Sequence, residues 1–199
     1  MIFKTTQSKM LQSACLAAIF FSTLAQSESN QQYVIPKSMQ VGDQLTSPAA
    51  AGVTDIQFNE FYKMPVGPKG LELTKKMVDL IGQRIRIVGY MAKSELLTSG
   101  LFVLSPMPVE MGDEDEKLVD DIPPNAIFVH MGDTKLNFPH IDRLIKLTGT
   151  LQVGSFDEAD GHVSTFRLAL DPEIIKDLTR AISKNTSTKN LGSSTQALK

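Results

Sequence analysis

Tryptophan is absent from the 199-residue sequence, and cysteine occurs once, at Cys15. Cys15 lies in an N-terminal segment that we expect to be cleaved, so the mature chain would have no disulfide, no cysteine nucleophile and no thiolate zinc site. Its stability must then come from the burial of apolar side chains, which a chain of this length can achieve as one domain.

A strong charge of either sign is also lacking. With 20 basic and 22 acidic residues, the formal net charge is −2. Cleavage would remove Lys4 and Lys9 but no acidic residue, which leaves a net charge of −4. Such a surface does not attract phosphate backbones, and an aromatic content of 7% offers few platforms for base stacking. We therefore expect no nucleic-acid partner.

The N-terminal segment has the pattern of a secretory signal peptide. Lys4 and Lys9 precede an apolar run over residues 10–21, and the small residues Thr23 and Ala25 follow it. The run is too short to span a membrane comfortably, so we predict a signal peptide over residues 1–25, cleavage after Ala25 and periplasmic localisation. The alternatives are an uncleaved anchor and a lipoprotein, and the residues before Cys15 disfavour the lipoprotein.

The rest of the chain divides by composition into three segments. Residues 26–54 are polar without a sustained period, and we predict a flexible leader, although Tyr33 and Ile35 can dock against the domain. Residues 55–184 are predicted to form a single OB-like β domain, a fold defined below. Residues 185–199 hold too few apolar side chains to offset the entropy of ordering, and we predict a disordered tail.

Hydrophobic periodicity predicts the elements of the domain. Strands are expected at residues 83–91, 100–106, 126–131, 144–154 and 162–170. The fourth strand should place Ile145, Leu147, Leu151 and Val153 in the core. A short helix is expected at residues 73–81, and a second helix from Pro172 to Lys184, with Asp171 as its cap.

The predicted fold class is mainly β. Short strands with Gly89 and Gly149 inside them favour a small, strongly curved antiparallel barrel of the oligonucleotide/oligosaccharide-binding (OB) type. A short N-terminal helix and a C-terminal helix complete this OB-like architecture. The alternative is a plain antiparallel sheet packed by the terminal helix.

Several segments resemble an uncharacterised exported bacterial family, domain of unknown function 3299. These segments are Leu80–Gly82, Ile85–Met91, Phe102–Leu104, Pro123–Ile127 and Leu147–Leu151. The resemblance covers residues 73–170 and implies a small OB-like barrel that carries a proline run before Asn-x-Ile. It also implies a transporter component as a partner. Where the family tends to carry a Cys-x-His element, this chain has MPVEMGD at residues 107–113.

The segment between the second and third strands, residues 107–125, is much longer than a hairpin needs, and such loops are usually functional or disordered. Its acidic run lacks the spacing of a calcium loop, which favours a solvated loop. We predict that the segment binds a cell-envelope protein, such as a transporter component. The residues predicted to make this contact are Met107, Met111, Leu118, Ile122, Pro123, Pro124 and Asn125. Alternatively, Leu118 and Ile122 pin the loop to the barrel.

Two histidines raise the question of a metal site. His130 and His140, together with Met107, Met111 and Met131, offer a nitrogen and sulfur ligand set suited to copper. The histidines lack a metal-ligand spacing, and His130 and Met131 should point to opposite faces of one strand. A half-buried, structural His130 is the alternative interpretation.

No catalytic motif is present. Ser105 and Ser164 lack the Gly-x-Ser-x-Gly context of a serine nucleophile, and no glycine-rich loop joins a strand to a helix. We therefore predict an exported, non-catalytic binding or accessory module without a cofactor. The alternative is a periplasmic copper-binding protein that uses His130, His140 and nearby methionines.

Overall fold

The computed structural model describes residues 35–42, 48–94, 97–111, 122–132 and 137–194. All of them belong to one unit, Gln32–Lys199. The predicted signal peptide and Leu118 lie outside the described residues. Within these described ranges, no helix is long and apolar enough to cross a membrane.

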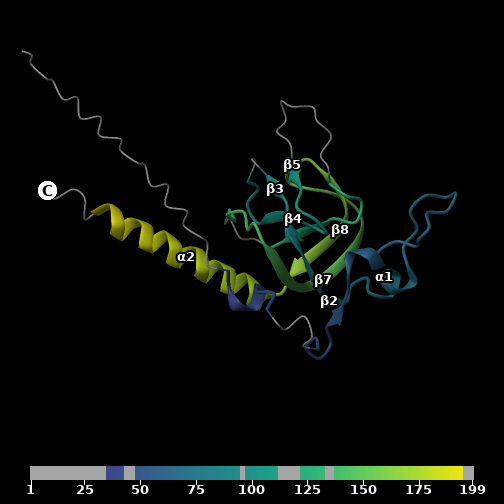
Figure 1. Cartoon of the computed structure of the whole chain (residues 1–199), viewed down its shortest axis with the longest axis horizontal. Helices are drawn as coiled ribbons and strands as arrows, with labels where there is room; N and C mark the ends of the chain where they lie inside the picture. Colours follow the sequence, from purple (N-terminus) through teal and green to yellow (C-terminus); the bar gives the residue numbers. More distant parts are fainter. Residues whose placement is uncertain (1–34, 43–47, 95–96, 112–121, 133–136, 195–199) are drawn as a thin grey trace, which may run out of the picture. The chain divides into compact units, whose positions relative to one another are not determined.

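A six-stranded sheet forms the body of the unit. In spatial order its strands are β1 (Thr54–Asp55), β2 (Arg84–Met91), β4 (Leu101–Ser105), β6 (Ile127–His130), β8 (Val163–Leu170) and β7 (Leu144–Asp157). β7 also pairs with β2, so the pairings that start at β2 return to it. The labelled strands curve around one another in Figure 1. The predicted mainly-β fold is confirmed.

The sheet is mixed, whereas the sequence predicted an antiparallel one. β6 runs parallel to β8, with Phe128 opposite Arg167, and β1 runs parallel to β2. Apolar alternation indicates which face of a strand is buried, but it carries no information on the direction of the neighbouring strand. The antiparallel prediction is therefore wrong for these two pairs.

The pairing of β7 with β8 is antiparallel, as predicted. Leu151 lies opposite Leu168, and the register shifts between Val153 and Phe156. Along β7 the alternate residues from Ile145 to Leu151 are buried, and Val153 is half-buried against the core. Because the side-chain period of a strand is two, a slip of one residue would expose this whole apolar set, and the register is firmly specified.

Two strand glycines lie where backbones approach closely. Gly149 on β7 is opposite Ile85 of β2 and Leu170 of β8. A Cβ atom at Gly149 would lie 2.3 Å from the carbonyl oxygen of Ala169. A Cβ atom at Gly89 would lie 2.7 Å from the carbonyl oxygen of Ser105. Neither position has room for a side chain, which agrees with the role expected for strand glycines in a curved sheet.

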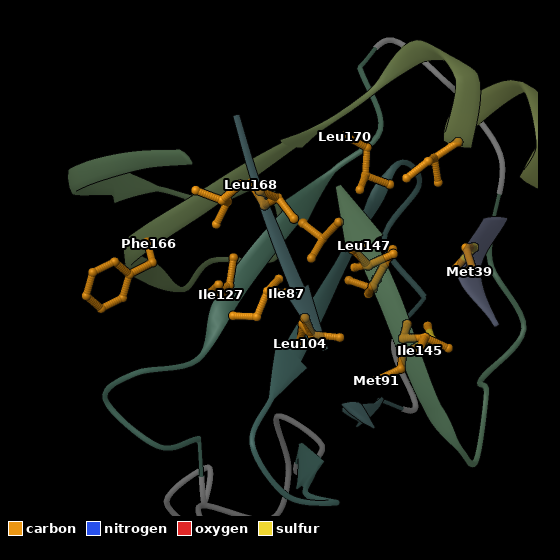
Figure 2. Close-up of a cluster of buried hydrophobic side chains, with 14 of the residues drawn as sticks. Met39, Ile87, Met91, Leu104, Ile127, Ile145, Leu147, Phe166, Leu168 and Leu170 are labelled. Carbon is orange, nitrogen blue, oxygen red and sulfur yellow. The ribbon is translucent and has the colours of Figure 1, made fainter. Parts of the chain in front are cut away.

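One hydrophobic cluster lies among these strands, and Figure 2 shows its side chains directed toward one another. The labelled members from β2, β4, β6, β7 and β8 are Ile87, Met91, Leu104, Ile127, Ile145, Leu147, Phe166, Leu168 and Leu170. The terminal helix α2 (Pro172–Ser194) adds Ile174 and Leu178. Burial of this apolar surface is the main term that stabilises the domain.

Part of the predicted flexible leader, residues 26–54, packs into this core. A 3₁₀ turn, η1 (Lys37–Met39), places Ile35 and Met39 among the buried residues. Gln40 forms an isolated bridge to Ile145, and the hydroxyl of Ser38 donates to Asp177 of α2 at 2.9 Å. At these positions the structure differs from the prediction, because two apolar side chains bury well even within a polar segment.

Both predicted helices are present with different ends. The short helix α1 (Lys75–Asp79) lies within residues 73–81, and the Thr74 hydroxyl accepts a hydrogen bond from the amide of Met77 at 3.2 Å. The terminal helix begins at Pro172, as predicted, but runs past Lys184 to Ser194. No proline interrupts that stretch, so helix formation extends into the segment predicted to be a disordered tail.

Candidate functional site

The described part of the loop at residues 107–125 is partly packed against the domain. Met111 lies in the short strand β5 (Glu110–Met111) and is buried in a second, smaller cluster. The other buried members of that cluster are Ala92, Leu101, Val103, Ala126 and Phe128. Ile122 is half-buried against it, whereas Met107 is exposed. For Ile122, the alternative interpretation of an apolar anchor is the one that the contacts favour.

Residues of the N-terminal part of the domain form hydrogen bonds with the proline–asparagine segment, Pro123–Asn125. The Tyr62 hydroxyl donates to the carbonyl of Pro124 at 2.9 Å. The Asn125 amide donates to the carbonyl of Phe58, in the turn η3 (Phe58–Glu60), at 3.1 Å. The amide of Ala126 donates to the carbonyl of Pro123 at 2.8 Å. These residues fix the entry of the chain into β6, and their role in partner binding stays a prediction.

The two histidines are in different surroundings. Nε2 of His130 lies 3.0 Å from Oε2 of Glu158, a close contact whose geometry is not that of a hydrogen bond. His140 lines a separate groove of about 300 Å³ together with Tyr90 and Glu110. Among the described residues, no group of three or more histidine, cysteine, aspartate or glutamate side chains could hold a metal ion.

A buried carboxylate, missed in the sequence, organises the turn between β7 and β8. The side chain of Glu158 is fully buried, and Arg167 of β8 donates to both of its oxygens, with Nε 2.7 Å from Oε1 and Nη2 3.1 Å from Oε2. The Ser164 hydroxyl also donates to Oε1. The Arg167 guanidinium stacks 4.3 Å from the centre of the Phe156 ring.

The charge state of Glu158 follows from these contacts. Burial acts to raise the pKa of Glu158, but the hydrogen bonds from Arg167 and Ser164 and the charges of His130 and Arg167 act against it. The net result is a pKa below the ordinary value, so the carboxylate is ionised at neutral pH. Because its oxygens are already occupied by protein donors, we interpret this network as a structural clamp on the hairpin rather than as a ligand site.

An open groove of about 500 Å³ lies on the faces of β2 and β7 that point away from the core. Residues 40–42 and the segment from β1 to η3 form its other walls. The lining residues are Gln40, Val41, Gly42, Asp55, Ile56, Gln57, Phe58, Asn59, Arg86, Val88 and Lys146. The groove combines charged, amide and apolar groups in a volume typical of small-molecule sites.

The two basic side chains of the groove differ in their partners. Arg86 is bound to Asp55, with Nη2 2.7 Å from Oδ2, and this hydrogen bond raises the pKa of Arg86. Lys146 lies opposite Val88 in the β2–β7 register. Among the residues that the structure describes, none forms an ion pair or a side-chain hydrogen bond with Lys146. Lys146 is thus a half-buried cation in the groove, and it is available to bind an anionic group of a ligand.

The remaining polar groups of the groove are mostly in use. Gln40 Nε2 donates to the carbonyl of Ile35 at 2.9 Å, and Gln57 takes part in the capping of η3. The Asn59 side chain makes no hydrogen bond to a described residue. Val88 and Phe58 supply apolar surface. Among the described residues, the lining contains no histidine, cysteine, serine, threonine or tyrosine, and its charged, amide and apolar groups are of the kinds that bind small ligands.

Sequence reasoning missed the groove because four segments that are separated in the chain form it. The alternation in β2 and β7 does place Arg86, Val88 and Lys146 on outward faces, and that signal is visible in the sequence. The packing of residues 40–42 against β7, in contrast, is not visible in the sequence.

No family model matches the chain, and no curated protein or solved structure matches it either.

Proposed function

We propose that the domain is an OB-type barrel that serves as a binding module. The series of pairings from β2 through β4, β6 and β8 to β7, with a further pair between β7 and β2, supports a closed arrangement of these strands. The close backbone approaches at Gly89 and Gly149 support the strong curvature that closure requires. Barrels of this type take ligands on one sheet face and its loops.

The groove on β2 and β7 is the proposed ligand site, and the unpaired Lys146 is the observation that carries this proposal. The ligand is a small molecule with an anionic group for Lys146 and an apolar part for Val88 and Phe58. Asn59 would add a hydrogen bond to a polar group of the ligand. A charge-assisted hydrogen bond in a recessed site is stronger than one at an open surface, which favours this class over neutral ligands.

The proposed place of action is the periplasm, beside a cell-envelope protein such as a transporter component. The signal-like segment at residues 1–25 and the resemblance to domain of unknown function 3299 support this proposal. Intact mass of the protein from the envelope fraction of its host tests export. The expected mature chain begins at Gln26, and a chain that retains Met1 would contradict export.

A thermal-shift screen of anionic small molecules, followed by titration calorimetry of the hits, tests the ligand site. Lys146→Gln should weaken binding by about tenfold to a hundredfold, because the charged hydrogen bond is lost. Lys176→Gln is the matched control, since Lys176 is exposed on α2 and distant in sequence from the groove. Equal affinities for wild type and Lys146→Gln would contradict the proposed site.

A further inference from the structure

Residues 62–73 form a hairpin-like arm that precedes α1. Tyr62 and Leu73 form a bridge at its base, and Gly67 and Gly70 form one at its tip. The amide of Lys63 donates to the carbonyl of Glu72 at 2.8 Å. Figure 1 shows this segment projecting away from the strands. The arm is therefore an ordered projection with its own backbone pairing.

Three large apolar side chains of the arm are directed to solvent. Met64 is 73% exposed, Val66 50% and Leu71 45%. Single exposed apolar side chains are common on protein surfaces and need no explanation. Three of them lie on one short projection, and a concentration of exposed apolar side chains can mark an interaction site.

The charge distribution of the arm favours contact with anionic groups. Its only acidic residue, Glu72, is neutralised by Lys63 at 3.0 Å. Lys69, near the tip, forms no ion pair with a described residue. No carboxylate occurs between Lys63 and Leu71. The tip is thus apolar and cationic, although the chain as a whole is mildly acidic.

At three positions near its tip the arm has no free backbone N–H group. Pro65 and Pro68 have no N–H group to desolvate, and the amide of Gly70 is bonded to the carbonyl of Gly67 at 3.0 Å. Because each unsatisfied backbone group is costly in a hydrocarbon-like environment, the other backbone groups of the arm favour shallow insertion over deep burial.

We propose that the arm inserts shallowly into an anionic lipid surface, with Met64, Val66 and Leu71 among the acyl chains and Lys69 at the phosphate groups. A protein partner fits less well, since three side chains on a narrow projection cover far less than the roughly 1,000 Å² that a specific interface buries. Shallow insertion requires only a small apolar area combined with attraction to anionic headgroups. This inference is independent of the groove and its ligand.

Co-sedimentation with vesicles tests the proposal, using the processed protein purified from its host. Phosphatidylglycerol mixed with phosphatidylethanolamine should bind the protein, and phosphatidylcholine alone should bind it more weakly. Combining Met64→Ser with Val66→Ser should lower the partition coefficient at least about tenfold. Val163→Ser removes a side chain of similar exposure, 65%, elsewhere on the surface and should change nothing.

The absence of tryptophan gives a second readout that does not depend on affinity. Val66→Trp should show a blue-shifted emission when anionic vesicles are added, and Val163→Trp should not. Lys69→Glu should weaken binding to phosphatidylglycerol vesicles and remove much of its salt dependence. The proposal is overturned by any of three results: no wild-type binding, equal partition of wild type and the double variant, or crosslinking of the arm to a protein without vesicle binding.

Discussion

Arg167 donates two hydrogen bonds to Glu158, one to each carboxylate oxygen, at 2.7 and 3.1 Å. The arginine belongs to β8 and the glutamate to the turn that follows β7, so this contact ties the hairpin to its own turn. Nη2 of Arg167 also donates to the carbonyl of Asp157 at 2.9 Å.

Glu158→Gln should lower the free energy of unfolding at neutral pH by about 3 kcal/mol, because it leaves Arg167 without its buried counterion. Urea denaturation measures the effect. Glu110→Gln is the matched control, since the ion pair between Glu110 and Lys93 is exposed and contributes at most about 1 kcal/mol. If both variants lost the same small amount of unfolding free energy, the contact between Glu158 and Arg167 would contribute little to stability.

The same carboxylate should make stability depend on acid. The folded-state pKa of Glu158 lies below the ordinary value of a glutamate, so the folded protein holds the proton less tightly than the unfolded chain. The stabilisation from the ionised Glu158 is therefore complete above the unfolded-state pKa, and it is lost as the pH falls through the folded-state pKa. Unfolding free energies measured down to about pH 3 should fall more steeply for wild type than for Glu158→Gln. Parallel curves would contradict this origin of the pH dependence.

Gly149→Ala should destabilise the domain by about 3 kcal/mol, because the new Cβ meets the backbone oxygen of Ala169, which has little freedom to move. Gly67→Ala serves as control, since a Cβ there has no neighbour within 4 Å and the backbone φ is not positive. Thermal unfolding of the two variants compares them directly. Equal midpoints would show that β7 and β8 are farther apart than described.

Leu147→Asp should prevent folding, because Leu147 is fully buried and an unpaired charge there has no partner. The milder Leu147→Ala should cost about 3 kcal/mol. Leu144→Ala, at a position 37% exposed on the same strand, should cost far less. Cooperative unfolding of Leu147→Asp at the wild-type midpoint would show that β7 is not central to the core.

Local patterns in the sequence were sufficient to predict some features of this fold. Alternation along residues 144–154 predicted the burial of Ile145, Leu147 and Leu151, because the period of a strand depends only on its own residues. The start of α2 at Pro172 followed from its capping residues. These features are local, and the structure confirms them.

Features that depend on which segments meet were not predictable in the same way. The parallel pairing of β6 with β8 is a property of the whole topology. Ile35 and Met39 lie in a polar segment whose composition suggested disorder. In the sequence, Glu158 has no feature that distinguishes it from other acidic residues in turns. Only the fold brings Arg167 and Ser164 beside it. The groove around Lys146 joins four separated segments and has no sequence motif.

The most direct test of the central proposal is a crystal structure of the protein with an anionic ligand obtained from the screen. We expect the ligand in the groove on β2 and β7, with its anionic group within hydrogen-bonding distance of Nζ of Lys146 and its apolar part against Val88. A ligand bound elsewhere on the domain, with Lys146 still uncontacted, would contradict the account.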